Sequence, residues 1–171
     1  MDRDGTTDLD WLEASGDIEE LNAYIGVVLA SLPDADTRIH SEGREIQSLL
    51  LRISLWLAGK ADISGTAGLA EDCLRLREIL RFSAAEMGGE LSQAGRSPMP
   101  DGHLSASMAL MARSICERAR RRLNTILDEP PEVTNSHILR SILDFLEHLS
   151  AYLVLLSNKC NKIASDRGLL H

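Results

Sequence analysis

Residues 135–164 read NSHILRSILDFLEHLSAYLVLLSNKCNKIA, and this stretch decides the fold class. Its large apolar residues recur at steps of three and four, which is the spacing of one broad apolar face on an α-helix. These residues are Ile138, Ile142, Phe145, Leu146, Leu149, Tyr152, Leu153, Leu156, Cys160 and Ile163. Asn135 is a suitable N-cap for this helix. The stretch therefore predicts the core-facing helix of an all-α bundle.

Four segments upstream show the same helical spacing. We expect helices over residues 17–32, 37–60, 66–87 and 104–127. Pro33 ends the first of them, and Gly88 and Gly89 end the third. Most connections are short, so the helices are expected to form an antiparallel five-helix bundle, a single domain over residues 17–171. The Gly- and Pro-rich segment 88–103 is a longer loop, of the kind that often carries function.

The composition agrees with a helical globular chain and excludes several classes of protein. Of 171 residues, 44% are hydrophobic and only 4% are aromatic, so aliphatic side chains must fill most of the core. The net charge of −8 argues against a general nucleic-acid binder. No apolar run approaches the ~20 residues of a membrane span, and the acidic start is unlike a signal peptide, so we expect a cytoplasmic location. Cys73, Cys116 and Cys160 are too far apart for a zinc site or a disulfide framework, and we expect no metal.

Three stretches carry a resemblance to a known family. Residues 112–121 read ARSICERARR after the turn PDG at 100–102, where the family has roughly A-R-T-V-C-R-R-A-E-R after Pro-Gly-Gly. Residues 145–154 read FLEHLSAYLV against Y-L-N-R-L-S-D-Y-L-F, and residues 16–26 read GDIEELNAYIG against G-x-V-D-E-L-N-A-x-I-G. The matches keep their order over nearly the whole chain. The sequence therefore resembles the PduO-type corrinoid (cobalamin) adenosyltransferases.

The resemblance implies a five-helix bundle that forms a homotrimer, with active sites in clefts between subunits. It implies transfer of the adenosyl group of ATP to the reduced cobalt of a corrinoid, so ATP and cobalamin are the expected small-molecule ligands. Residues 1–16 then correspond to an N-terminal remnant of a nucleotide loop. The cofactor-binding residues expected from the family positions are Gly5, Thr6, Thr7, Ser97 and His148.

The expected catalytic residues lie on the last two helices and are Arg113, Glu117, Arg118 and Glu147. The family has Arg at position 117 and Glu at position 120, whereas this chain has Glu117 and Arg120. Residues three apart are neighbours on a helix, so the exchange predicts a local ion pair. The resemblance also implies that Arg113 pairs with Glu19 of another subunit.

The departures from the family pattern leave three hypotheses open. The first is a working corrinoid adenosyltransferase. The second is a repurposed enzyme that uses the inter-subunit cleft for acid–base chemistry on another small molecule, and a cleft carboxylate with a raised pKa would favour it. Its candidate groups are Asp101, His103, Glu117, Glu147 and His148. The third is a non-catalytic protein that binds a corrinoid or another ligand without turnover.

Overall fold

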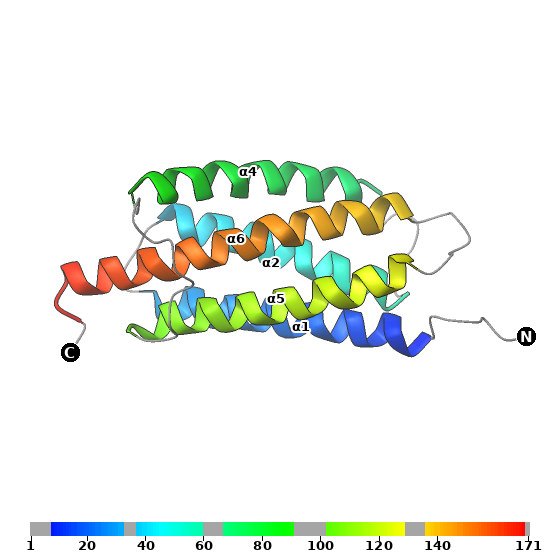
Figure 1. Cartoon of the computed structure of the whole chain (residues 1–171), viewed down its shortest axis with the longest axis horizontal. Coiled ribbons are helices and arrows are strands. Elements are labelled where there is room, and N and C mark those ends of the chain that lie inside the picture. The colour runs from blue at the N-terminus through cyan, green and yellow to red at the C-terminus, as the bar shows by residue number, and fades with distance from the viewer. Residues whose placement is uncertain (1–7, 33–36, 60–66, 91–101, 129–135, 170–171) are drawn as a thin grey trace, which may run out of the picture.

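The computed structural model describes residues 8–32, 37–59, 67–90, 102–128 and 136–169 of the chain. Within these ranges the chain forms five helices and no strand, which confirms the expected all-α fold (Figure 1). The helices are α1 (Asp8–Ser31), α2 (Thr37–Leu57), α4 (Leu69–Glu90), α5 (Leu104–Asp128) and α6 (Ser136–Asp166).

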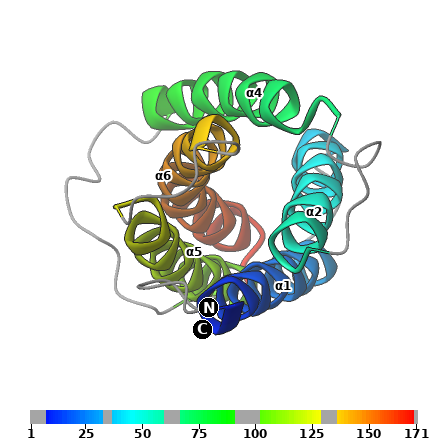
Figure 2. The same ribbon diagram turned by 90° about the vertical axis from the view of Figure 1, so that its right-hand side faces the viewer.

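Consecutive helices run in opposite directions along one long axis, as the colour gradient in Figure 1 shows. Seen from one end, the helices form a ring in the order α4, α6, α5, α1 and α2 (Figure 2). The packed pairs agree with this order, and the contact between α2 and α4 is the smallest of them. The predicted antiparallel five-helix bundle is therefore confirmed.

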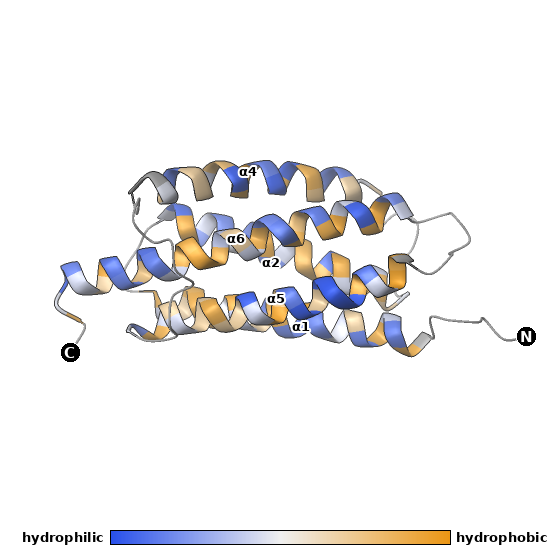
Figure 3. Ribbon diagram, viewed as in Figure 1, coloured by the Kyte–Doolittle hydropathy of each residue, from blue (hydrophilic) through white to orange (hydrophobic). Residues whose placement is uncertain are grey.

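The predicted apolar face of α6 lies in the core of this ring. Its residues are all buried except Ile163, which is half-buried. Phe145 and Tyr152 are the largest fully buried side chains. Full burial of one large aliphatic side chain contributes roughly 1.5–3 kcal/mol, so this face alone holds α6 firmly among its neighbours. Figure 3 shows hydrophobic and hydrophilic residues following one another along α4, α5 and α6.

Helix α1 begins at Asp8, and the predicted start at residue 17 was wrong. The described part of segment 1–16 therefore belongs to the bundle. Trp11 explains the longer helix, because its ring packs edge-to-face on Trp56 of α2, with 5.8 Å between centroids and 76° between planes. This packing offsets the cost of Gly16 inside the helix, which is about 1 kcal/mol relative to alanine.

Helix α4 continues through Gly88 and Gly89 to Glu90, so the predicted end at residue 87 was also wrong. Met87 is buried, which gives the last turn an apolar anchor despite the low helix propensity of the two glycines. The remainder of the predicted loop, residues 91–101, lies outside the described ranges.

A buried carboxylate joins α2, α4 and α6. Glu42 accepts hydrogen bonds from Arg38 Nε at 2.8 Å, from the Ser83 hydroxyl at 2.5 Å and from the Tyr152 hydroxyl at 3.0 Å. A buried charge is tolerated only when it is paired and hydrogen-bonded, and Glu42 meets both conditions.

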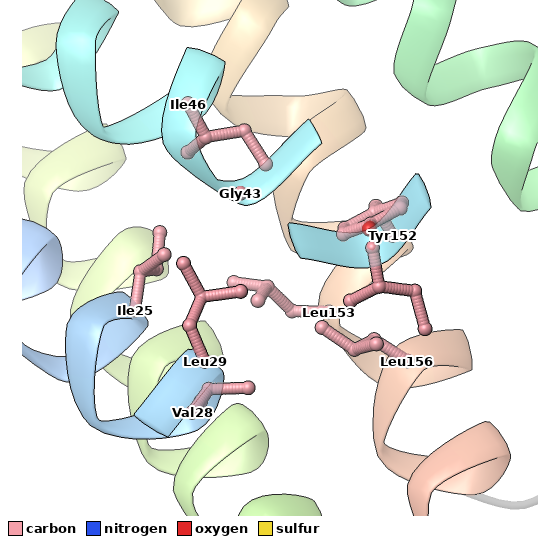
Figure 4. A pocket seen from close by; sticks show the side chains of 9 residues that line it. Ile25, Val28, Leu29, Gly43, Ile46, Tyr152, Leu153 and Leu156 are labelled. Atoms are coloured by element: carbon pink, nitrogen blue, oxygen red, sulfur yellow. The ribbon is translucent and has the colours of Figure 1, made fainter. Parts of the chain in front are cut away.

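A small apolar pocket lies between α1, α2 and α6 (Figure 4). It is lined by Ile25, Val28, Leu29, Ile39, Gly43, Ile46, Tyr152, Leu153 and Leu156. Gly43 permits the close packing here, because a Cβ at this position would lie 2.5 Å from Leu29 Cδ2. The lining is almost wholly apolar and includes none of the predicted site residues. Among the described residues, no helix is long and apolar enough to span a membrane.

Candidate active site between α5 and α6

Helices α5 and α6 bring four polar side chains into contact. Glu117 and Arg120 lie one turn apart on α5, and Glu147 and Ser150 lie one turn apart on α6. We call these four residues the α5–α6 cluster. The side chains of Glu117 and Arg120 are 28% and 24% exposed, Glu147 is 65% exposed and Ser150 is buried. The cluster is therefore open to solvent on one side and fixed to the bundle on the other.

The contacts within the α5–α6 cluster centre on the carboxylate of Glu117. Arg120 Nη1 donates to both of its oxygens, at 3.0 and 3.1 Å, and the Ser150 hydroxyl donates to Oε1 at 2.5 Å. Arg120 Nη2 donates to Glu147 Oε2 at 3.2 Å. The ion pair predicted from the exchange of residues 117 and 120 is confirmed.

The pKa of the Glu117 carboxyl is set by opposing effects. Burial raises it, but the hydrogen bond from Ser150, the charge and hydrogen bond of Arg120 and the charge of Arg113 together hold this pKa below its ordinary value. Glu117 is therefore an ionised acceptor at neutral pH. The shift is opposite to the one that a general acid would need.

Arg113 lies one turn before Glu117 on α5 and is half-buried. Its Nε atom is buried without a hydrogen-bond partner. Among the described residues, the one charge that it faces is the carboxylate of Glu117. Arg113 is thus a cation with donors left over, which suits an acceptor from outside the subunit.

Arg118 has a different environment from the other predicted catalytic residues. Its Nε donates to Asp17 Oδ1 at 2.9 Å, and its Nη2 donates to Glu20, so its guanidinium is directed to α1. Arg122 adds a second contact to Asp17, with 3.3 Å between Nε and Oδ2. The structure therefore places Arg118 in a seam of ion pairs between α1 and α5 and not in the α5–α6 cluster.

His148 also lies apart from the α5–α6 cluster, although it follows Glu147 directly. Its Nδ1 is 2.9 Å from the backbone oxygen of Asp144, whose carboxylate accepts from Arg77 Nη1 of α4 at 2.5 Å. Adjacent residues on a helix point in different directions, so Glu147 lies against α5 and His148 lies on the side of α4.

His103, a candidate of the repurposed-enzyme hypothesis, lies at the start of α5. Its Nδ1 is 2.8 Å from the Ser105 hydroxyl and accepts the backbone N–H of Ser105 at 3.3 Å. Its own backbone N–H donates to Asn161 Oδ1 at 2.9 Å. These contacts make His103 the N-cap of α5 and tie that end of the helix to α6.

The other predicted cofactor-binding residues, Gly5, Thr6, Thr7 and Ser97, lie outside the described residues, as does Asp101. Ser150 was missed by sequence reasoning. The signal that it carries is its place one turn after Glu147 within the apolar face of α6, where a buried hydroxyl needs a partner. Within the described ranges, no group of three or more His, Cys, Asp or Glu side chains is placed to hold a metal ion.

The cysteines offer no reactive thiol. Cys73, Cys116 and Cys160 are free and buried. Burial, partly offset by the charge of Arg52, raises the pKa of the Cys73 thiol to about 12. Burial likewise raises the pKa of Cys116, which lies beside Glu117 and donates to the backbone oxygen of Leu146 at 3.3 Å. A thiol that stays protonated is a poor nucleophile, so these cysteines act as packing residues.

Comparison with known proteins places the chain in a family. Residues 7–160 match the family described as cobalamin adenosyltransferase, and this range includes all five helices up to the last turns of α6. The comparison with curated proteins found no match. Because the family match covers far more than half of the chain, the chain belongs to the cobalamin adenosyltransferase family.

Proposed function

We propose that the chain forms a homotrimer that binds a corrinoid and ATP in clefts between its subunits and transfers the adenosyl group of ATP to cob(I)alamin. The observation that carries this proposal is the family match over residues 7–160, which includes the α5–α6 cluster and Arg113. The fold that positions these side chains is the five-helix bundle of the family.

The reaction sets a clear demand on the residues of the cleft. The reduced cobalt attacks C5′ of ATP, a Co–C bond forms, and the C5′–O bond breaks as triphosphate leaves with the electron pair. Groups that stabilise developing negative charge accelerate such a step. On α5 the guanidinium groups of Arg113 and Arg120 are the candidates for this stabilisation. We assign Arg120 to the triphosphate because it lies in the α5–α6 cluster, which is open to solvent on one side.

Assembly is the second part of the proposal, and two surface features support it. Leu12, Gly16, Glu19, Ala23 and Val27 follow one exposed side of α1, where small and apolar residues allow another helix to approach closely. Glu19 forms no ion pair with any described residue, and Arg113 has none either. We propose that Glu19 of one subunit binds Arg113 of the next. Free cysteines suit a reducing compartment, so we also propose a cytoplasmic location.

The test is an adenosylation assay under reducing conditions. Purified protein is mixed with a reduced corrinoid and ATP, and formation of the Co–C bond is followed by absorbance spectroscopy. The proposal expects adenosylated product that requires both the protein and ATP. Titration calorimetry that detects no ATP binding, together with an absence of product, would contradict it.

A second candidate function is favoured by Glu117. An ionised carboxylate stands where the family pattern has a guanidinium, and it repels a triphosphate in a partly dry site. This observation favours a protein that binds a corrinoid without transferring an adenosyl group. Its mark in the same assay is a change in the corrinoid spectrum on protein binding, with no Co–C product when ATP is added.

A further inference from the structure

The donors around Glu117 have the chemistry of an anion site. One guanidinium nitrogen, Arg120 Nη1, and the Ser150 hydroxyl converge on the Glu117 carboxylate. Guanidinium N–H groups and hydroxyls donate to carboxylate and phosphate oxygens alike. The donors around the carboxylate would therefore serve a phosphate group equally well.

The donors are also held in place by contacts that do not involve Glu117. Ser150 is buried on the packed face of α6, and Arg120 Nη2 is bound separately by Glu147. Removal of the Glu117 carboxylate would leave the Ser150 hydroxyl and Arg120 Nη1 without an acceptor. Buried or half-buried donors without acceptors are costly, and that cost favours the entry of another anion.

We propose that Glu117 acts as an internal ligand, which fills an anion site formed by Arg120 and Ser150 and thereby weakens the binding of polyphosphate groups at the α5–α6 cluster. The carboxylate belongs to the same helix as Arg120, so it competes at a high effective concentration. Glu117 also lowers the local positive charge, because the two cations Arg113 and Arg120 are then matched by the two carboxylates of Glu117 and Glu147. The inference deepens the proposed function, on which it rests for the role of the ligand but not for the binding itself.

The test compares the native chain with Glu117→Ala by titration calorimetry, using inorganic tripolyphosphate as the probe. We expect the variant to bind tripolyphosphate about tenfold more tightly, since an acceptor is lost and a repelling charge is removed. Parallel titrations with ATP and with adenosine separate phosphate recognition from nucleoside recognition, and adenosine is expected to show no gain. Glu117→Gln, which keeps the side-chain volume, is measured as well, so that a folded variant is available.

Glu71→Gln is the control for net charge. It changes the net charge by the same amount, but it lies exposed on α4, which contributes no residue to the α5–α6 cluster. We expect no gain for this control, and we expect the gain of Glu117→Ala to disappear in the double variant with Arg120→Ala. Circular dichroism verifies the fold of each variant.

Three results would overturn the inference. They are equal affinity of the native chain and the folded Glu117 variants, an equal gain for Glu71→Gln, and a gain that survives loss of Arg120. If Glu117→Ala gains tripolyphosphate binding while neither the native chain nor any variant adenosylates a corrinoid, the inference is supported and the proposed reaction is contradicted. The two proposals therefore fail separately.

Discussion

Among single residues, Glu42 connects the most helices, because its carboxylate is buried where α2, α4 and α6 meet. Its acceptors are used by Arg38, Ser83 and Tyr152. Arg38 remains half-exposed. The buried carboxylate therefore accepts hydrogen bonds from one surface cation and two hydroxyls. Such an acceptor stabilises one arrangement of α2, α4 and α6, because all three donors reach it only when the helices are correctly placed.

We predict that Glu42→Gln lowers the free energy of unfolding by about 2 kcal/mol, because the amide nitrogen would face donors and leave them unpaired. Tyr152→Phe removes a single hydrogen bond at the same site and should cost about 1 kcal/mol. Urea unfolding followed by circular dichroism measures both values. A Glu42→Gln variant as stable as the native chain would show that the buried contacts do not stabilise the bundle.

The pKa of Glu117 leads to a prediction on acid stability. Its pKa in the folded chain is lower than its ordinary value, so its contribution to stability is fully present above about pH 4.3 and is lost as the pH falls through the folded value. Glu117→Gln cannot titrate. The stability difference between the native chain and this variant should therefore shrink as urea unfolding is repeated from pH 7 down to pH 3. Parallel pH profiles for the two proteins would contradict the assignment.

Among the helices, α4 is attached in two different ways. Toward α2 it uses ion pairs, namely Arg38 with Glu86, Arg52 with Asp72, and Arg75 with Glu45. Toward the core it presents Leu69, Cys73, Leu76 and Leu80, all buried. Exposed ion pairs contribute 0 to about 1 kcal/mol each, whereas one buried leucine contributes several times as much. The apolar face therefore holds α4, and the ion pairs only refine its position.

We predict that Leu76→Ala destabilises the chain by about 3 kcal/mol, while Arg75→Met, which keeps the apolar stem, costs less than about 0.5 kcal/mol. Urea unfolding gives both values. A further measurement in 1 M salt should shift the midpoint of the native chain only slightly. If Arg75→Met proved as damaging as Leu76→Ala, the ion pairs would be holding α4 and the ranking would be reversed.

The bounds of the helices show how far the fold could be predicted from the sequence. The periodicity of α6 is long and regular, and its predicted range of 135–164 differs little from Ser136–Asp166. The start of α1 was missed because Gly16 and Asp17 resemble a helix boundary, while the contacts that extend the helix involve residues distant in sequence. Trp11 on Trp56, and the Ser15 hydroxyl on the backbone oxygen of Ser54 at 2.9 Å, are contacts of this kind.

The candidate site was predictable to a similar degree and for the same reason. Spacing on one helix was enough to predict the pair of Glu117 and Arg120. Spacing did not reveal that Ser150 caps the same carboxylate, or that Arg118 turns away to Asp17 on α1. Both contacts depend on the rotation of one helix against another, which a single sequence does not encode in its local pattern.

At the scale of the whole molecule, Glu19 and Arg113 are among the charged groups for which the described part of the subunit provides no ion-pair partner. Glu19 is exposed on α1, and Arg113 is half-buried on α5. Each subunit carries a net charge of −8, so copies repel one another at long range. Salt screens that repulsion beyond roughly 8 Å at physiological ionic strength, and specific short contacts then decide assembly.

We predict that the native chain is a trimer at micromolar concentration in light scattering coupled to size exclusion, and that Glu19→Arg or Arg113→Glu alone shifts it toward the monomer. Each single reversal places like charges together at the proposed contact. The double reversal restores an opposite pair and should recover the trimer, which a general loss of folding would not do. Glu71→Arg, an equal charge change on the exposed face of α4, serves as the control and should leave the trimer intact. A monomeric native chain, or folded single and double variants with the same mass as each other, would show that Glu19 and Arg113 do not join subunits.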